Sequence, residues 1–239
     1  MKNALVTGGS GGIGASVCRR LAAGGHHVFV HAHRSLDQAA AVVETIRAAG
    51  GSAAAVAFDV TDRAATGAAL GALLERGPIQ ILVNNAGIHD DAVFAGMSGE
   101  QWDRVVAVSV GGFFNVTQPL TLPMIRTRWG RIINVTSAAA VAGNRGQVNY
   151  SAAKGALHAA GKSLALELAS RGITVNAVAP GIIATGMSAD AFDPETIKRL
   201  VPMQRAGRPD EVAELIAFLA SDGAAYISGQ IISINGALI

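Results

Sequence analysis

Seven short apolar runs recur along the chain, and longer segments with helical periodicity separate them. Nearly every position within a run is apolar, instead of alternating between apolar and polar, which is typical of strands in a sheet that is covered on both faces. The runs lie at residues 4–6, 28–30, 54–58, 79–83, 131–135, 173–178 and 231–234.

The intervening segments predict helices at about 12–24, 35–49, 62–76, 99–127, 149–171 and 209–220. This alternation predicts a Rossmann-type α/β fold, a doubly wound parallel seven-stranded sheet with helices on both faces. No Pro/Ser-rich linker or repeat divides the chain, so we expect a single domain over residues 1–239. The irregular segment 184–208 carries Met, Phe and polar residues, and we expect it to act as a lid.

Composition agrees with this fold and excludes several other classes. Of 239 residues, 50% are hydrophobic and 15% charged, which excludes a disordered chain. The net charge is only +2 and no basic run occurs, so nucleic acid is not an expected partner. No run of about 18 apolar residues predicts a membrane span. The single cysteine, Cys18, cannot form an internal disulfide, so we expect a buried, inert thiol in a cytoplasmic protein.

A glycine-rich segment follows the first apolar run directly, and a helix begins within it. Glycines permit a tight turn and let the backbone approach a pyrophosphate, and the free N–H groups of a helix N-terminus favour that charge. At the first strand–helix junction, the segment predicts a dinucleotide site more strongly than a plain turn. No Lys follows it, so a nucleoside-triphosphate P-loop is not predicted. The candidate contacts are Thr7, Gly8, Ser10, Gly12, Ile13 and Gly14.

The end of the second run carries cationic residues where an NAD site ordinarily has a carboxylate. The nearest carboxylate, Asp37, falls inside the next helix. Arg34, flanked by His33 and Ser35, offers donors for a 2′-phosphate, which predicts NADP(H); a solvated cationic turn is the alternative. His31 and His33 share one strand face, but no third ligand is close in sequence, so we predict no metal site.

Ser137, Tyr150 and Lys154 are the candidates for catalysis. Tyr150 and Lys154 lie at i and i+4 and therefore share one helix face. A neighbouring ammonium is expected to lower the pKa of the phenol toward neutrality, and such a Tyr can exchange a proton with a carbonyl or alcohol. Taken alone, Tyr-x-x-x-Lys is more often an ordinary solvated pair, so this interpretation depends on the other motifs.

These motifs together resemble those of the short-chain dehydrogenase/reductases over the whole chain. The resemblance rests on the glycine segment 7–14, on Asn84-Asn85-Ala86-Gly87, on the set Ser137, Tyr150 and Lys154, and on Pro180-Gly181. Within the family, segments 130–137, 146–154, 171–181 and 218–222 are most similar to bacterial 3-oxoacyl-[acyl-carrier-protein] reductases.

The resemblance implies NADPH-dependent reduction of a 3-oxoacyl thioester, held on acyl carrier protein, by a homotetramer. The alternatives are a reductase or dehydrogenase for another carbonyl or alcohol (an acyl-CoA, a polyketide or a sugar) and a catalytically weak dinucleotide-binding protein. It also implies cofactor contacts beyond the glycine loop. These are Asp59 and Val60 for adenine, Asn85, Ala86, Gly87 and Lys154 for the nicotinamide ribose, and Pro180, Gly181, Ile183 and Thr185 near the carboxamide.

One position departs from the family pattern. Ser109 stands where the family usually has an Asn that anchors a proton-relay water through its backbone and a local helix distortion. A backbone carbonyl is present whatever the side chain, so we expect the relay to survive. An acidic carrier protein also needs a basic surface, and Arg126, Arg128 and Arg131 form one candidate cluster. Arg128 and Arg171 are the docking candidates because the similar reductases are basic at both positions.

Overall fold

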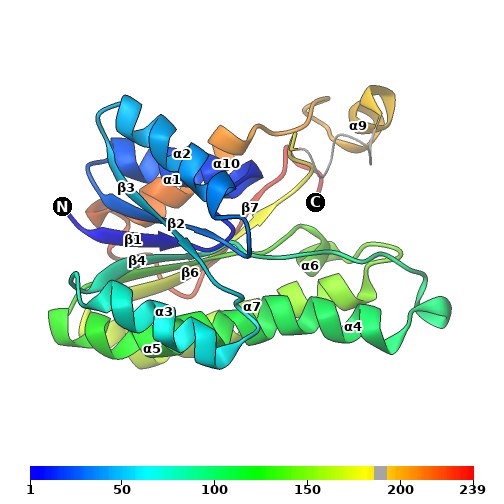
Figure 1. The fold of residues 1–239 in the computed structure, drawn as a ribbon. Helices are drawn as coiled ribbons and strands as arrows, with labels where there is room; N and C mark the ends of the chain where they lie inside the picture. The colour runs from blue at the N-terminus through cyan, green and yellow to red at the C-terminus, as the bar shows by residue number, and fades with distance from the viewer. Residues whose placement is uncertain (186–192) are drawn as a thin grey trace.

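Seven parallel strands form the centre of the fold, in the order β3-β2-β1-β4-β5-β6-β7 (Figure 1). The structure is a computed structural model and describes residues 1–185 and 193–239. The predicted doubly wound sheet is confirmed. The strands are β1 (Asn3–Val6), β2 (His27–Ala32), β3 (Ser52–Ala57), β4 (Ile79–Asn84), β5 (Gly130–Val135), β6 (Ile173–Pro180) and β7 (Ile231–Ile234).

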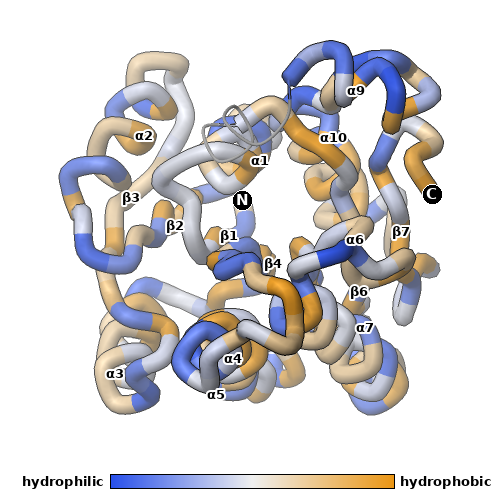
Figure 2. The backbone as a smooth tube through the Cα atoms, turned by 90° about the vertical axis from the view of Figure 1, so that its right-hand side faces the viewer, coloured by the Kyte–Doolittle hydropathy of each residue, from blue (hydrophilic) through white to orange (hydrophobic). Residues whose placement is uncertain are grey.

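Helices cover both faces of the sheet (Figures 1 and 2). One face carries α1 (Gly12–Ala23), α2 (Leu36–Ala48) and α10 (Pro209–Leu219). The other carries α3 (Arg63–Leu74), α4 (Gly99–Val106), α5 (Gly112–Thr127) and α7 (Val148–Leu168). Within β2, Val28 and Val30 belong to one core cluster and Phe29 to the other. A strand buried on both faces in this way needs apolar side chains at successive positions, which explains the unbroken apolar runs.

The predicted helix at 99–127 is interrupted. Residues Ala107–Gly111 form a π-helical turn, η2, between α4 and α5. By length and composition the stretch Gly99–Thr127 could span a membrane, although it holds no unbroken run of about 18 apolar residues. In this fold its Val116 and Leu120 are fully buried against the sheet. The π-helical turn Ala107–Gly111 is the local helix distortion that was expected around Ser109.

The sequence predicts that segment 184–208 acts as a lid, and the structure describes only part of this segment. Its residues 186–192 lie outside the described part of the chain. The remainder contains a helix that the sequence did not predict, α9 (Pro194–Leu200), which Asp193 caps through the Thr196 N–H at 2.9 Å. Beyond α9, the N–H of Met203 donates to the carbonyl oxygen of Gly236 at 3.3 Å, and α9 lies near the C-terminus (Figure 1).

The parallel topology gathers the candidate site at one edge of the sheet. Figure 2 is viewed from this carboxyl edge, with β1 and β4 between α1 and α10 on one side and α4 and α5 on the other. The glycine loop follows β1, the loop beginning at Asn85 follows β4, and Ser137 follows β5. Ligand crevices in open α/β sheets lie at this edge, where the strand order reverses. Shorter elements complete the chain: α6 (Ala139–Ala142), η1 (Phe94–Gly96), η3 (Ala169–Arg171) and η4 (Asp222–Ala224).

Candidate active site

The glycine loop forms a cradle that has no room for a side chain at Gly8, Gly9 or Gly14. Gly8 has a φ of +62°, which glycine adopts without strain, and a Cβ there would lie 3.0 Å from the Asn85 amide nitrogen. A Cβ on Gly14 would overlap the carbonyl oxygen of Gly8. No side chain caps α1, and a helix leaves the N–H groups of its first turn, here at Gly12 and Ile13, without intrahelical partners. The loop therefore fits a dinucleotide pyrophosphate.

Thr7 and Asn85 fasten this cradle to the loop after β4. The Thr7 hydroxyl oxygen accepts hydrogen bonds from the backbone N–H groups of Asn85 and Ala86, both at 3.0 Å. The Asn85 side-chain amide donates to the carbonyl oxygens of Thr7 and Gly8, at 2.9 and 3.0 Å. Thr7 and Asn85 thus shape the cradle through their side chains. Ser10 is half-buried in the same loop, and direct cofactor contacts of these residues stay predictions.

His31 supports the cradle from below and is not arranged as a metal ligand. Its Nδ1 accepts a hydrogen bond from the Gly8 N–H at 3.0 Å, and its Nε2 donates to the carbonyl oxygen of Phe58 at 2.9 Å. Burial lowers the pKa of His31 to about 4, so the ring is neutral at physiological pH. Because each ring nitrogen takes part in one of these two hydrogen bonds, neither is available to bind a metal.

The end of β2 carries the cationic group that the sequence predicted. Arg34 is exposed, and His33 lies 3.6 Å from the carboxylate of Asp59. Asp59 accepts hydrogen bonds from the hydroxyl and the backbone N–H of Thr61, at 2.7 and 2.9 Å, and these bonds with the nearby His33 and Arg34 charges lower its pKa. The Ser35 hydroxyl oxygen caps α2. A 2′-phosphate contact through His33, Arg34 and Ser35 stays a prediction.

Ser137, Tyr150 and Lys154 converge where β5 ends and α7 begins. The Ser137 side chain lies close enough to the Tyr150 hydroxyl to lower its pKa. The Lys154 ammonium is buried and donates to the carbonyl oxygen of Val135 at 2.9 Å. It also lies against Gly87, where a Cβ would be 2.9 Å from Nζ, so the glycine after β4 makes room for the lysine.

The pKa of Tyr150 shifts in the direction opposite to the one expected. Burial raises it above the ordinary value of 10.0, the neighbouring Ser137 side chain lowers it in part, and the charge of Asp91 raises it further. The expected lowering by Lys154 is wrong for this structure because that ammonium is turned toward Val135 and lies 5.9 Å from the centre of the Tyr150 ring. The phenol is consequently protonated at neutral pH, the form that can donate a proton.

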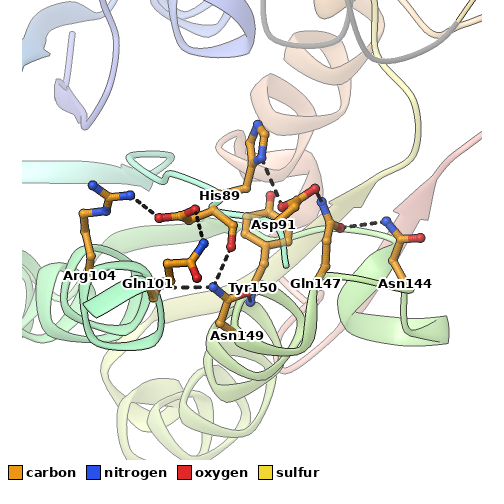
Figure 3. Close-up of polar contacts among 9 residues, drawn as sticks. His89, Asp91, Gln101, Arg104, Asn144, Gln147, Asn149 and Tyr150 are labelled. Carbon is orange, nitrogen blue, oxygen red and sulfur yellow. Dashed lines mark hydrogen bonds and ion pairs between the residues drawn. The ribbon is translucent and has the colours of Figure 1, made fainter. Parts of the chain in front are cut away.

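A polar network that the sequence did not reveal holds Tyr150 in place (Figure 3). The fully buried Asn149 accepts a hydrogen bond from the Tyr150 N–H at 2.8 Å. Its amide donates to the carbonyl oxygens of Asp90 and Gln101, at 2.9 and 3.2 Å. The Asp90 carboxylate accepts a hydrogen bond from Gln101 and forms an ion pair with Arg104. The loop after β4, α4 and the first turn of α7 are thereby locked together.

Ser109 lies inside the π-helical turn and faces a small internal cavity. It is 3% exposed, and its hydroxyl has no hydrogen-bond partner among the described residues. The cavity reaches the end of β4, where Asn84 braces the sheet by donating to Thr117 and Asn134, both at 3.0 Å. Its lining includes Thr7, Val60, Asn84, Ala86, Ser109 and Gly112.

The residues after β6 lie beside the Ser137 segment and the glycine loop. The carbonyl oxygen of Pro180 accepts a hydrogen bond from the Ala138 N–H at 2.8 Å, which ties β6 to the Ser137 segment. Ile183 is buried, and a Cβ on Gly12 would lie 3.5 Å from the Thr185 methyl group. Thr185 therefore faces the glycine loop. Contacts of Pro180, Gly181, Ile183 and Thr185 with a carboxamide stay predictions.

Arg128 and Arg171 lie together, but at the opposite edge of the sheet. The Arg128 guanidinium donates to the carbonyl oxygen of Ser170, the neighbour of Arg171, at 3.2 Å. Arg128 precedes β5 and Arg171 precedes β6, so both stand at the amino ends of strands. Tyr150 stands with the carboxyl ends, so these arginines cannot line the mouth of the same chain's site.

Arg131 does not belong to a basic surface cluster, and grouping it with Arg126 and Arg128 was wrong. It is 2% exposed and donates hydrogen bonds to three backbone carbonyls. Its guanidinium stacks 4.2 Å from the centre of the Trp129 ring and lies 3.5 Å from the Asp222 carboxylate. Stacking and carbonyl acceptors thus allow a charged residue to be buried at the start of an apolar strand.

Comparison with known proteins places this geometry in a family. The family model described as short chain dehydrogenase matches residues 2–196. The chain belongs to the short-chain dehydrogenase family. The resemblance noted in the sequence is confirmed. As a short-chain dehydrogenase, the chain is an oxidoreductase that uses a nicotinamide dinucleotide.

Several curated short-chain dehydrogenases are similar to the chain over nearly its full length. A 3-oxoacyl-[acyl-carrier-protein] reductase of Aggregatibacter actinomycetemcomitans is 42% identical over 236 residues, with 98% of each chain covered. A 3-oxoacyl-[acyl-carrier-protein] reductase of Synechocystis sp. is 44% identical over 238 residues, covering 99% of this chain and 96% of that one. Nodulation protein G of Azospirillum brasilense is 42% identical over 240 residues, covering 99% and 98%.

Proposed function

We propose that the chain reduces the 3-oxo group of an acyl thioester, carried on acyl carrier protein, to the 3-hydroxyl group with NADPH. The observation that carries this proposal is the convergence of Ser137, Tyr150 and Lys154 beside the cradle for a dinucleotide. The 3-oxoacyl-[acyl-carrier-protein] reductases that are 42–44% identical to the chain support the substrate class.

The protein's own residues supply acid catalysis and orientation. Tyr150 donates its phenolic proton to the carbonyl oxygen, and Ser137 hydrogen-bonds the same oxygen. Lys154 holds the ribose hydroxyls. The bound cofactor supplies the hydride. The backbone carbonyl of Ser109, within the π-helical turn, anchors the proton-relay water.

NADPH is the proposed cofactor because of the group at the end of β2. Arg34 is exposed, and no carboxylate belongs to the last residues of β2. Asp59, the nearby carboxylate from the end of β3, is engaged with Thr61 and with His33. A 2′-phosphate would therefore meet the Arg34 charge, whereas a 2′-hydroxyl has no dedicated acceptor on β2.

Carrier-protein docking and oligomerisation are linked in this proposal. Arg128 and Arg171 stand at the sheet edge away from Tyr150, so a carrier bound to them delivers its acyl group to the site of a neighbouring subunit. The proposed homotetramer provides such neighbours. The single buried Cys18 agrees with a reducing, cytoplasmic location.

The decisive experiment measures NADPH oxidation with a 3-oxoacyl group on acyl carrier protein and on a small thioester. The proposal expects turnover with both substrates and its loss in Tyr150→Phe. Turnover of unrelated ketones or sugars without activity on either thioester would instead establish a different reductase. NADPH binding without turnover of any carbonyl would establish a weak dinucleotide-binding protein.

A further inference from the structure

A histidine stands next to Tyr150 and has no role in the proposed mechanism. His89 belongs to the loop after β4, and its ring centre lies 6.4 Å from that of Tyr150, with the planes at 81° (Figure 3). Its side chain is 47% exposed, so a ligand can reach it. The imidazole thus borders the approach to the proton donor.

Three further side chains fix the orientation of this imidazole (Figure 3). His89 Nδ1 lies 3.2 Å from one carboxylate oxygen of Asp91, and Gln147 donates to the other oxygen at 2.9 Å. The Gln147 oxygen in turn accepts a hydrogen bond from Asn144 at 2.9 Å. Because a carboxylate accepts only, Nδ1 must carry the hydrogen in this pair. In the tautomer with its hydrogen on Nδ1, Nε2 is an acceptor, and none of the described residues donates to it.

The position of Asp91 reinforces the link between this group and Tyr150. Its charge raises the pKa of Tyr150, so its carboxylate lies within electrostatic reach of the phenol. The backbone is fixed here as well, because the Ala92 N–H donates to the carbonyl oxygen of Gly146 at 2.9 Å. The histidine is therefore held by its side chain and its loop, which is what a precise hydrogen bond to a ligand requires.

We propose that His89 is a substrate-binding residue whose Nε2 accepts a hydrogen bond from the first amide N–H of the arm of a pantetheine thioester. This inference rests on the proposed function. When the 3-oxo group meets Tyr150 and Ser137, the C2 methylene, the thioester group and a two-carbon link separate the 3-oxo carbon from that amide nitrogen. The His89 ring, whose centre lies 6.4 Å from that of Tyr150, provides an acceptor at a distance that suits this spacing. Asp91 and Gln147 are positioning residues for His89.

The test compares two small 3-oxoacyl thioesters that differ only in the arm. The N-acetylcysteamine thioester has the amide N–H, and the S-butyl thioester lacks it. His89→Phe keeps a flat ring against Tyr150 but removes the acceptor. We expect KM for the amide-bearing substrate to rise about fivefold to tenfold, the loss typical of one hydrogen bond. KM for the S-butyl thioester and kcat for both should change less than twofold.

Two further variants control for indirect effects. His89→Gln restores an acceptor and should recover part of the preference for the amide. His27→Phe changes a histidine at the opposite edge of the sheet and should alter neither KM, and thermal unfolding verifies the fold of each variant. Equal KM changes on both thioesters, or none on either, would overturn the assignment. If the wild type reduces neither thioester, the proposed function is wrong, and the assignment of His89, which rests on it, is overturned with it.

Discussion

The Lys154 ammonium lies 5.9 Å from the centre of the Tyr150 ring, one helical turn away on α7. It is held at this distance by the carbonyl oxygen of Val135, to which it donates at 2.9 Å. In this position the ammonium does not lower the Tyr150 pKa, which burial and the charge of Asp91 raise above its ordinary value. Lys154 is also buried, and burial disfavours its charged form. Its pKa therefore falls to about 8, so Lys154 itself titrates near neutral pH.

Burial lowers the pKa of Lys154 from 10.5 to about 8, which makes stability depend on pH. Between about pH 8 and 10.5, the unfolded chain binds a proton that the folded chain does not, so the free energy of unfolding rises with pH. Below pH 8 both states bind the proton, and the cost of burying the charge is fully present. We expect Lys154→Met to remove this rise, on the order of 3 kcal/mol, in denaturant titrations across the window.

Cys18 provides an internal check on that measurement. Burial raises the pKa of its thiol, so its contribution to stability falls at high pH, the opposite sense to Lys154. The wild type and Lys154→Met both contain Cys18. The difference between their free energies of unfolding at each pH therefore isolates the contribution of the lysine. Parallel pH profiles for the two proteins would contradict the lowered pKa.

Tyr150→Phe tests the proton donor. Phe keeps the ring against His89 but has no proton to give, so we expect kcat to fall about 10²- to 10⁴-fold while NADPH affinity changes little. Stopped-flow or steady-state NADPH oxidation gives the first quantity, and cofactor fluorescence titration gives the second. Turnover near that of the wild type would show that another group donates the proton.

The fold and the motif residues could be predicted because their signals are local. Apolar runs mark strands buried on both faces, and strand ends in a parallel sheet gather at one edge, so Ser137 and the glycine loop had to lie at the same edge. Residues that depend on tertiary contacts gave no such signal. Asn149 resembles any polar helix residue, yet it joins three segments. Arg131 is buried only because Trp129 and backbone carbonyls surround it.

The direction of the Tyr150 pKa could not be predicted for a related reason. Spacing along a helix places Lys154 on the same face as Tyr150, but it does not say which atom the ammonium contacts. The shift is decided by burial of the phenol and by Asp91, which is distant in sequence. Sequence spacing therefore identified the pair and left its electrostatics to the fold.

Arg34→Ala tests cofactor choice. A charge-assisted contact with the 2′-phosphate is worth roughly 1.5–3 kcal/mol, so the wild type should prefer NADPH over NADH by about 10- to 100-fold in kcat/KM. The variant should lose most of this preference through a higher KM for NADPH, with NADH nearly unaffected. Equal kcat/KM values for the two cofactors in the wild type would contradict the assignment.

Ser109→Asn tests whether the side chain in the π-helical turn limits the enzyme. The backbone carbonyl is unchanged by the substitution, so we expect kcat to change less than about tenfold. The Asn side chain extends toward the cavity that Ser109 faces, and thermal unfolding reports whether the fold accepts it. A gain of about a hundredfold in turnover would show that Ser109 limits catalysis and would favour the weak dinucleotide-binding alternative.

Reversing the charge of Arg128 and Arg171 tests carrier docking. Both guanidinium groups stand away from the chain's own Tyr150, so Arg128→Glu with Arg171→Glu should leave the chemistry intact. Charges at the rim of an interface act mainly on association rate and its salt dependence. KM for the carrier-bound substrate should therefore rise, most at low salt, while a small thioester is reduced as before. Arg126→Glu, at the last turn of α5, is the matched control, with a smaller effect expected. Equal loss on both substrates would indicate damage to folding or to the active site and would contradict docking at this surface.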